Sequence, residues 1–349
     1  MAAFSYTGVP SKEISELLDR ALPAIADSID GMGLQGLAAV VLGGGYGRGE
    51  GGVLRTPDGD RLYNDLDFFV FTDGAGSRER RRIQEELGRL SQQWETRLGV
   101  ALDFGPPKDI GAVAKVSRTL MYQELLRGWR PVWGRLDLCR IIPALRSDEI
   151  PFNEAARLLL NRGMGLLLAG GKLASGADEA DFIVRNMNKA ILGIGDALLI
   201  AAGQYCWRGE ERVNAFAAFA EANGLAPDWP DAYGRAYRYK LEPRPELPDE
   251  PWPEWLKCRK LYLDAVMRVA SAGSGGASVS SGLHRAAARE RSLGNALRWL
   301  LKARCWRPLP QAFDPPQVSV LARLYALLDG SEKYPGCPDW LLGLWRKFN

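Results

Sequence analysis

Three aspartates in the first third of the chain have the spacing of a metal-binding site. Asp65 and Asp67 lie two residues apart in "LYNDLDFFVF" (residues 62–71), whose β-branched and aromatic residues predict a strand. Residues two apart in a strand face the same side, so both carboxylates should point the same way. Like charges this close destabilise one another unless a cation or a proton is shared. Mg²⁺ would remove the repulsion, because it prefers carboxylate oxygens as ligands.

A third carboxylate follows one predicted helix later. Asp103 lies in the short apolar segment "GVALDFG" (residues 99–105), which also predicts a strand. We expect this strand to neighbour that of Asp65 and Asp67, so that Asp103 completes the ligand set. Three such acids suit a pair of Mg²⁺ ions, which in phosphoryl transfer clamp the attacking and the leaving oxygen.

A glycine-rich segment, "LGGGYGRGEGGV" (residues 42–53), directly follows the strand-like run "LAAVV" (residues 37–41). So much glycine indicates that the backbone must approach another group closely. Residues 47–52 formally fit GxGxxG, but a turn-forming segment follows them and the chain has no GxxxxGK[ST] motif. The glycine segment alone is therefore a weak indication of phosphate binding.

Taken together, the glycine segment, the paired aspartates and the later third aspartate resemble the DNA polymerase β-like nucleotidyltransferase superfamily. The stretch "GGYGRGE" (residues 44–50) is most similar to the uridylyltransferases that modify the nitrogen regulatory protein PII. The resemblance extends over about residues 37 to 145. It implies that Asp65, Asp67 and Asp103 bind two Mg²⁺ ions and that Asp103 also helps to deprotonate the acceptor hydroxyl.

The same resemblance assigns roles within the glycine segment. Gly44 and Gly45 match the paired small residues that meet the β- and γ-phosphates of an NTP, with ATP as the favoured nucleotide. Arg48 and Gly49 match the arginine and the glycine that close the loop. An arginine paired with its neighbour Glu50 is the alternative reading of Arg48.

Three features depart from the family pattern. Gly45 stands where serine is frequent, which removes one hydroxyl contact to phosphate. The spacer before Asp65 is lengthened by a predicted hairpin at residues 53–63, around a Pro-Asp-Gly-Asp turn. The histidine-rich hydrolase half of the PII-modifying enzymes is absent, so nucleotide removal is not expected.

The predicted elements divide the chain into two domains. Amphipathic helices at residues 11–30 and 78–98 alternate with the strands, which indicates an α/β (α+β) nucleotidyltransferase domain with a small mixed sheet over residues 1–150. Strand signals then fade, and residues 151–349 predict a mainly helical domain. Its small-residue run at residues 270–282 predicts a flexible linker or loop.

The helical domain offers further candidate residues. Arg185, Lys189 and Asp196 fall on one side of a predicted helix, opposite its apolar stripe. Relatives use cations of their helical domain on the triphosphate, so Lys189 is a candidate nucleotide contact in a cleft between the domains, with a solvated helix face as the alternative. A basic amphipathic helix is predicted at about residues 285–304, and His284 beside the linker is expected to be exposed.

Composition limits the other possibilities. The chain of 349 residues has a net charge of +3, too close to neutral to favour extended nucleic-acid binding or an anionic membrane. One histidine and five cysteines without a CxxC pair disfavour a zinc site and Ser-His-Asp catalysis. Neither a signal peptide nor a membrane-spanning segment is evident, which favours a cytoplasmic protein.

We therefore expect metal-dependent transfer of a nucleoside monophosphate from an NTP to an acceptor hydroxyl, with release of pyrophosphate. The acceptor, a small molecule or a protein, stays open. A non-catalytic nucleotide sensor or interaction module on the same fold, and an enzyme that modifies RNA ends, are the alternatives.

Overall fold

The computed structural model describes residues 5–271, 278–303, 311–330 and 336–348. They form two compact units, which are described separately. The first unit comprises Met1–Leu145 together with Arg238–Arg244, and the second comprises Arg146–Tyr237 and Pro245–Asn349. The sequence analysis did not anticipate that Arg238–Arg244 belongs to the first unit.

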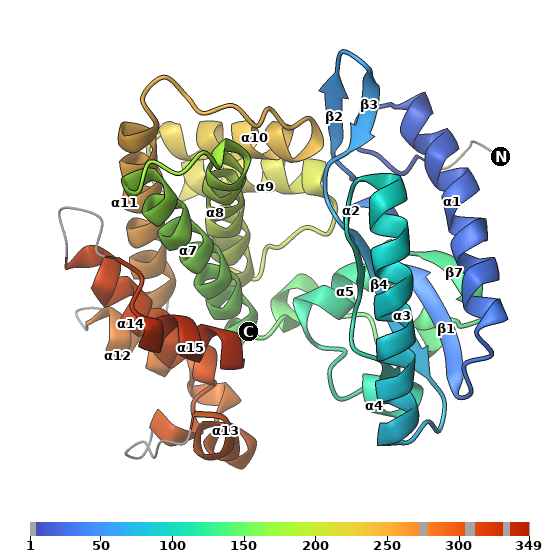
Figure 1. Cartoon of the computed structure of the whole chain (residues 1–349). Coiled ribbons are helices and arrows are strands. Elements are labelled where there is room, and N and C mark those ends of the chain that lie inside the picture. Colours follow the sequence, from blue (N-terminus) through green and yellow to red (C-terminus); the bar gives the residue numbers. More distant parts are fainter. Residues whose placement is uncertain (1–4, 272–277, 304–310, 331–335, 349) are drawn as a thin grey trace. The chain divides into compact units, whose positions relative to one another are not determined.

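The first unit is built on a small mixed sheet of five strands, as the sequence predicted (Figure 1). Strand β4 (Leu66–Thr72) pairs antiparallel with β1 (Leu37–Leu42) and parallel with β5 (Leu102–Phe104). The strands β6 (Lys108–Asp109) and β7 (Arg130–Gly134) pair with β4 and β1, respectively. The sequence analysis missed β7, which contains Pro131 and lies at the edge of the sheet, where a residue without an N–H is tolerated.

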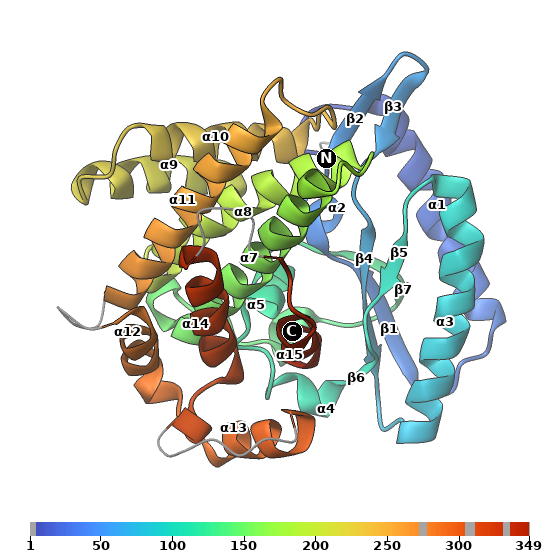
Figure 2. The same ribbon diagram turned by 60° about the vertical axis from the view of Figure 1, so that its left-hand side comes forward.

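Both faces of this sheet are covered. Helices α1 (Lys12–Gly31) and α3 (Ser77–Leu98) pack against one face, where alternate residues of β1, Val40 and Leu42, join their core (Figure 2). The intervening residues Ala39 and Val41 of β1 pack into a second core with helix α5 (Leu120–Arg127) and the short helix α6 (Leu138–Ile141). The helices predicted at residues 11–30 and 78–98 are confirmed, and the Ser11 hydroxyl caps α1 by accepting a bond from the Ile14 N–H.

The glycine segment and the hairpin connect β1 to β4. Residues Gly44–Arg48 form the short helix α2, where the sequence analysis expected an open loop. The predicted hairpin is confirmed as β2 (Val53–Thr56) and β3 (Gly59–Leu62), which are paired antiparallel (Figure 1). Because Leu62 belongs to β3 and β4 begins only at Leu66, the strand expected over residues 62–71 is shorter than predicted.

The second unit is helical throughout the residues that the structure describes. Its long helices are α7 (Phe152–Ala174), α8 (Ala180–Ala201) and α11 (Pro251–Ser271). The buried Trp255 and Tyr262 of α11 donate hydrogen bonds to the Leu166 and Leu159 carbonyls of α7, at 2.8 and 2.9 Å. Further helices complete the unit: α9 (Gly209–Ala222), α10 (Asp228–Leu241, of which the last four residues belong to the first unit), α12 (Val279–Ala286), α13 (Leu293–Arg298), α14 (Pro316–Asp329) and α15 (Asp339–Phe348).

One prediction for this unit was wrong, and another falls partly outside the described residues. The continuous helix expected at about residues 285–304 is divided, because the Ser292 hydroxyl caps a new helix by accepting from the Asn295 N–H. The linker expected at residues 270–282 is occupied at its ends by α11 and α12, and residues 272–277 lie outside the described residues. None of the described helices combines the length and apolar character needed to cross a membrane.

Candidate metal centre

The sheet places Asp67 and Asp103 side by side. The two residues are direct partners in the parallel register of β4 and β5. Their neighbours on either side, Phe68 and Phe104 among them, point into the core, and those two rings stack with centroids 4.6 Å apart. Because side chains alternate along a strand, burial of the phenylalanines turns both carboxylates away from that core.

Asp65 joins the pair from just before the strand. The Leu66 N–H donates to the Ala101 carbonyl at 2.9 Å, which ties the start of β4 to the segment that leads into β5. One carboxylate oxygen from each of Asp65, Asp67 and Asp103 lies within 4.8 Å of the others. Asp65 and Asp103 are exposed and Asp67 is half-buried, so the cluster is accessible from solvent. The three predicted metal ligands are thus brought together.

Gly44 shows what the glycine segment must approach. Its φ of 60° lies in the left-handed region, and a Cβ added there would stand 1.8 Å from Oδ2 of Asp67. The Gly43 N–H also donates to the Asp67 carbonyl at 2.8 Å. At Gly45 the nearest atom to an added Cβ, the Glu50 carbonyl oxygen, would be 3.3 Å away, so the space is less restricted. The group approached most closely is the Asp67 carboxylate.

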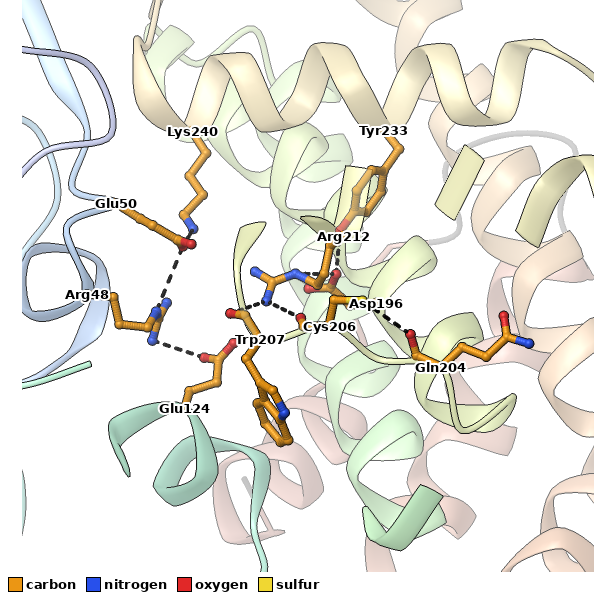
Figure 3. A network of polar contacts seen from close by, with 10 residues as sticks. All are labelled: Arg48, Glu50, Glu124, Asp196, Gln204, Cys206, Trp207, Arg212, Tyr233 and Lys240. Carbon is orange, nitrogen blue, oxygen red and sulfur yellow. Dashed lines mark hydrogen bonds and ion pairs between the residues drawn. The ribbon is translucent and has the colours of Figure 1, made fainter. Parts of the chain in front are cut away.

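The end of α2 is fixed by ion pairs. Gly49, with a φ of 78°, terminates the helix. The Arg48 guanidinium lies 3.2 Å from a Glu124 carboxylate oxygen and 3.8 Å from Oε2 of Glu50 (Figure 3). The same Glu50 oxygen lies 2.7 Å from Nζ of Lys240. The pairing of Arg48 with Glu50, which the sequence analysis considered as an alternative, is therefore present. The closer carboxylate is that of Glu124.

Tyr46 fills the space beneath the hairpin. Its buried hydroxyl donates to the Gly52 carbonyl at 2.7 Å and accepts from the Tyr63 N–H at 3.0 Å. These bonds join the two ends of the hairpin. Burial raises the pKa of Tyr46 to about 12, and the Asp65 carboxylate adds to this in the same direction. Sequence reasoning assigned no role to Tyr46, which lies inside the stretch GGYGRGE, or to Glu124 and Lys240.

The candidates on α8 lie in the second unit. Lys189 is half-buried, and its contact with a nucleotide stays a prediction. Arg185 pairs with Asp181 at 3.6 Å, one turn away on the same helix. Asp196 accepts a hydrogen bond from the Tyr233 hydroxyl at 2.5 Å and lies 3.3 Å from the Arg212 guanidinium (Figure 3). Asp196 thus joins helices α8, α9 and α10.

His284 is buried, contrary to the expectation of an exposed side chain. Its Nδ1 lies 2.6 Å from the fully buried Asp314, which also accepts from Arg291 at 2.7 Å. A cavity of about 1010 Å³ also lies in the second unit, between α8, α10 and α11. Its lining includes none of the predicted site residues.

Comparisons of the chain with protein-family models, with curated proteins and with solved structures found no match. The aspartate cluster and the residues around it are therefore the basis for a proposed function.

Proposed function

We propose that this protein transfers a nucleoside monophosphate from an NTP, with ATP favoured, to a hydroxyl group of a small-molecule or protein acceptor, and releases pyrophosphate. The observation that carries the proposal is the cluster of Asp65, Asp67 and Asp103. The mutual repulsion of carboxylates gathered at two neighbouring strands is relieved if they hold cations, which can then bind an anionic substrate.

The donor set fits a hard divalent cation. All three ligands are carboxylate oxygens, which Mg²⁺ prefers, and they lie close enough for one ion to contact more than one of them after small side-chain movements. Asp65, Asp67 and Asp103 would hold two Mg²⁺ ions. When bound, the ions would neutralise charge on the triphosphate and on the attacking and leaving oxygens.

The residues of the chain then have separate tasks. The acceptor oxygen forms a bond to the α-phosphorus while the bond from that phosphorus to the bridging oxygen of pyrophosphate breaks. Asp103 is exposed, and its carboxylate takes the proton of the acceptor hydroxyl as that bond forms. Asp67 is held by β4 and by the contact with Gly44, so its carboxylate needs little reorganisation.

The glycine segment contributes the phosphate contacts. Gly45 carries no side chain, and we expect the first amides of α2 to contact phosphate oxygens. Gly49 ends this helix, and Arg48, its last residue, is oriented by Glu124 and Glu50. Arg48 supplies positive charge from the other end of α2, where its backbone lies about 6 Å along the helix axis from Gly44. Lys189 is a further candidate for the triphosphate.

A pyrophosphate-release assay with matched variants tests this function. The purified protein is incubated with Mg²⁺, each of the four labelled NTPs and panels of hydroxyl-bearing small molecules and proteins. Asp67→Asn should lower the rate by about 10³-fold or more, because a charge that stabilises the transition state is lost. Asp58→Asn is the control, since Asp58 lies exposed in the hairpin turn. It should retain the wild-type rate.

Equal inactivity of the wild type and Asp67→Asn across all NTPs and acceptors would exclude the catalytic proposal. A rise in Tm on addition of ATP and Mg²⁺, without pyrophosphate, would instead identify a nucleotide sensor. Steeply salt-dependent RNA binding with extension of RNA ends would identify the RNA-modifying alternative.

A further inference from the structure

Residues Arg238–Arg244 lie on the base of the β2–β3 hairpin. The Tyr239 hydroxyl lies 2.7 Å from that of Tyr63, which leads out of the hairpin toward Asp65. Arg55 of β2 pairs with Glu242 at 3.0 Å. A Cβ added to Gly52 would stand 2.8 Å from the Lys240 carbonyl oxygen, so the two backbones pass in close contact. The segment therefore touches both ends of the insertion between α2 and β4.

Lys240 adds a charge at the point where the glycine segment ends. Its Nζ lies 2.7 Å from Oε2 of Glu50, while the Arg48 guanidinium is 3.8 Å from the same oxygen. Arg48 is 3.2 Å from Glu124 on its other side. The side chains of these four residues are between 13% and 20% exposed. At this burial, charges interact more strongly than on an open surface.

The four charges balance as two carboxylates and two cations. Without Lys240, the three charged groups that remain, Arg48, Glu50 and Glu124, would carry a net charge of −1. That excess would add to the negative potential of the Asp67 carboxylate, against which Gly44 of the glycine segment lies. An anionic triphosphate would be repelled, and Arg48 would be less available to it.

We propose that Lys240 is a positioning residue for nucleotide binding. By holding Glu50, it keeps the Arg48 guanidinium oriented by Glu124 and available to the phosphates of the bound nucleotide (Figure 3). This inference rests on the proposed function. Lys240, which lies far along the chain from the glycine segment, would thereby contribute to the affinity of that segment for an NTP.

Steady-state kinetics with Mg²⁺-ATP test the role of the charge. Lys240→Gln should raise the KM about ten-fold, the range of one charged hydrogen bond, and change kcat less than two-fold. Lys240→Arg should restore the KM to within about three-fold of the wild type, because it keeps the charge. The double variant Glu50→Gln/Lys240→Gln should also recover, because the excess carboxylate is gone. Lys12→Gln is the control, because Lys12 forms an exposed pair with Glu16 at 3.6 Å.

An unchanged KM in Lys240→Gln, or a double variant no better than the single one, would overturn the proposal. Hydrogen exchange of residues 43–52, measured without nucleotide, tests the role of Lys240 independently of the proposed function. Lys240→Gln should exchange these amides at least several-fold faster than the wild type and Lys12→Gln, whether or not the protein turns over ATP. Equal exchange would show that Lys240 does not hold this segment.

Discussion

Two sets of aspartates, one in each unit, lie in opposite surroundings. In the helical unit, Asp196 lies against Arg212 and Asp314 lies against both Arg291 and His284. In the sheet unit, Asp65, Asp67 and Asp103 gather with one another. Removal of an acid that is buried beside a cation destabilises the fold, because the cation loses its partner, whereas acids gathered at two neighbouring strands repel one another until a cation binds. The difference separates structural acids from those of a site.

The largest expected effect concerns an aspartate that is paired with a cation in the helical unit. Asp314→Asn should lower the free energy of unfolding by about 3 kcal/mol, because it leaves the Arg291 and His284 interactions without their buried charge. Urea unfolding measures the loss. The exposed Asp58→Asn should change stability by less than about 0.5 kcal/mol. A cost for Asp314→Asn as small as that of the control would contradict a structural role.

Substitution of Gly44 tests how closely the glycine segment approaches the Asp67 carboxylate. Gly44→Ala should cost about 2 kcal/mol, since it combines a left-handed φ with a Cβ in the place of the Asp67 carboxylate. Gly74→Ala is the matched control, because Gly74 has a φ of 64° but nothing within 4 Å of an added Cβ. It should cost about 1 kcal/mol. Equal costs in urea unfolding would mean that Asp67 simply moves aside.

Each unit also buries a tyrosine near an aspartate, which gives a dependence on pH. Burial is the main cause that raises the pKa of Tyr46 to about 12, and it also raises that of Tyr233 beside Asp196. The pKa of Tyr46 is higher in the folded protein than the value of 10 in the unfolded chain, because the fold favours the neutral phenol. The contribution of this preference to the free energy of unfolding is therefore complete below pH 10 and is lost as the pH rises from 10 through 12. At pH 11 the loss is about 1.4 kcal/mol.

Tyr46→Phe should therefore lose less stability between pH 9 and pH 11 than the wild type, by about that amount. Denaturant unfolding at the two pH values provides the measurement. If the free energy of unfolding changed equally in the two proteins between pH 9 and pH 11, Tyr46 would ionise as readily in the folded state as in the unfolded one.

The smallest effect has the opposite sign. Asp103→Asn should raise the stability of the metal-free protein by about 0.5 kcal/mol at low salt, because it relieves repulsion among the three carboxylates. Thermal unfolding in a chelating buffer shows the change, which added salt should reduce. A loss of stability would mean that Asp103 makes a structural contact instead.

The positions of the aspartates could be predicted because they follow from local rules. A period of two sets the side chains of β4, and a parallel neighbour one helix later places Asp103 opposite Asp67. The glycine segment was correctly expected to approach another group. That this group is the Asp67 carboxylate depends on a three-dimensional contact, which no local pattern encodes.

Long-range contacts and competing local effects explain the features that the sequence did not predict. Glu124 and Lys240 meet Arg48 and Glu50 only through tertiary packing, so nothing near either residue predicted the contact. The small residues before His284 suggested exposure, but α12 packs so that His284 reaches Asp314. The helix expected at residues 285–304 failed because a cap at Ser292 competes with its continuation.

Binding of Mn²⁺, followed by electron paramagnetic resonance, tests most directly whether the three acids form a metal centre. Titration of the metal-free wild type should show saturable binding that ATP strengthens. Asp67→Asn should lose it, and Asp58→Asn should bind as the wild type does. Equal Mn²⁺ binding by wild type and Asp67→Asn, or none by either, would contradict the account.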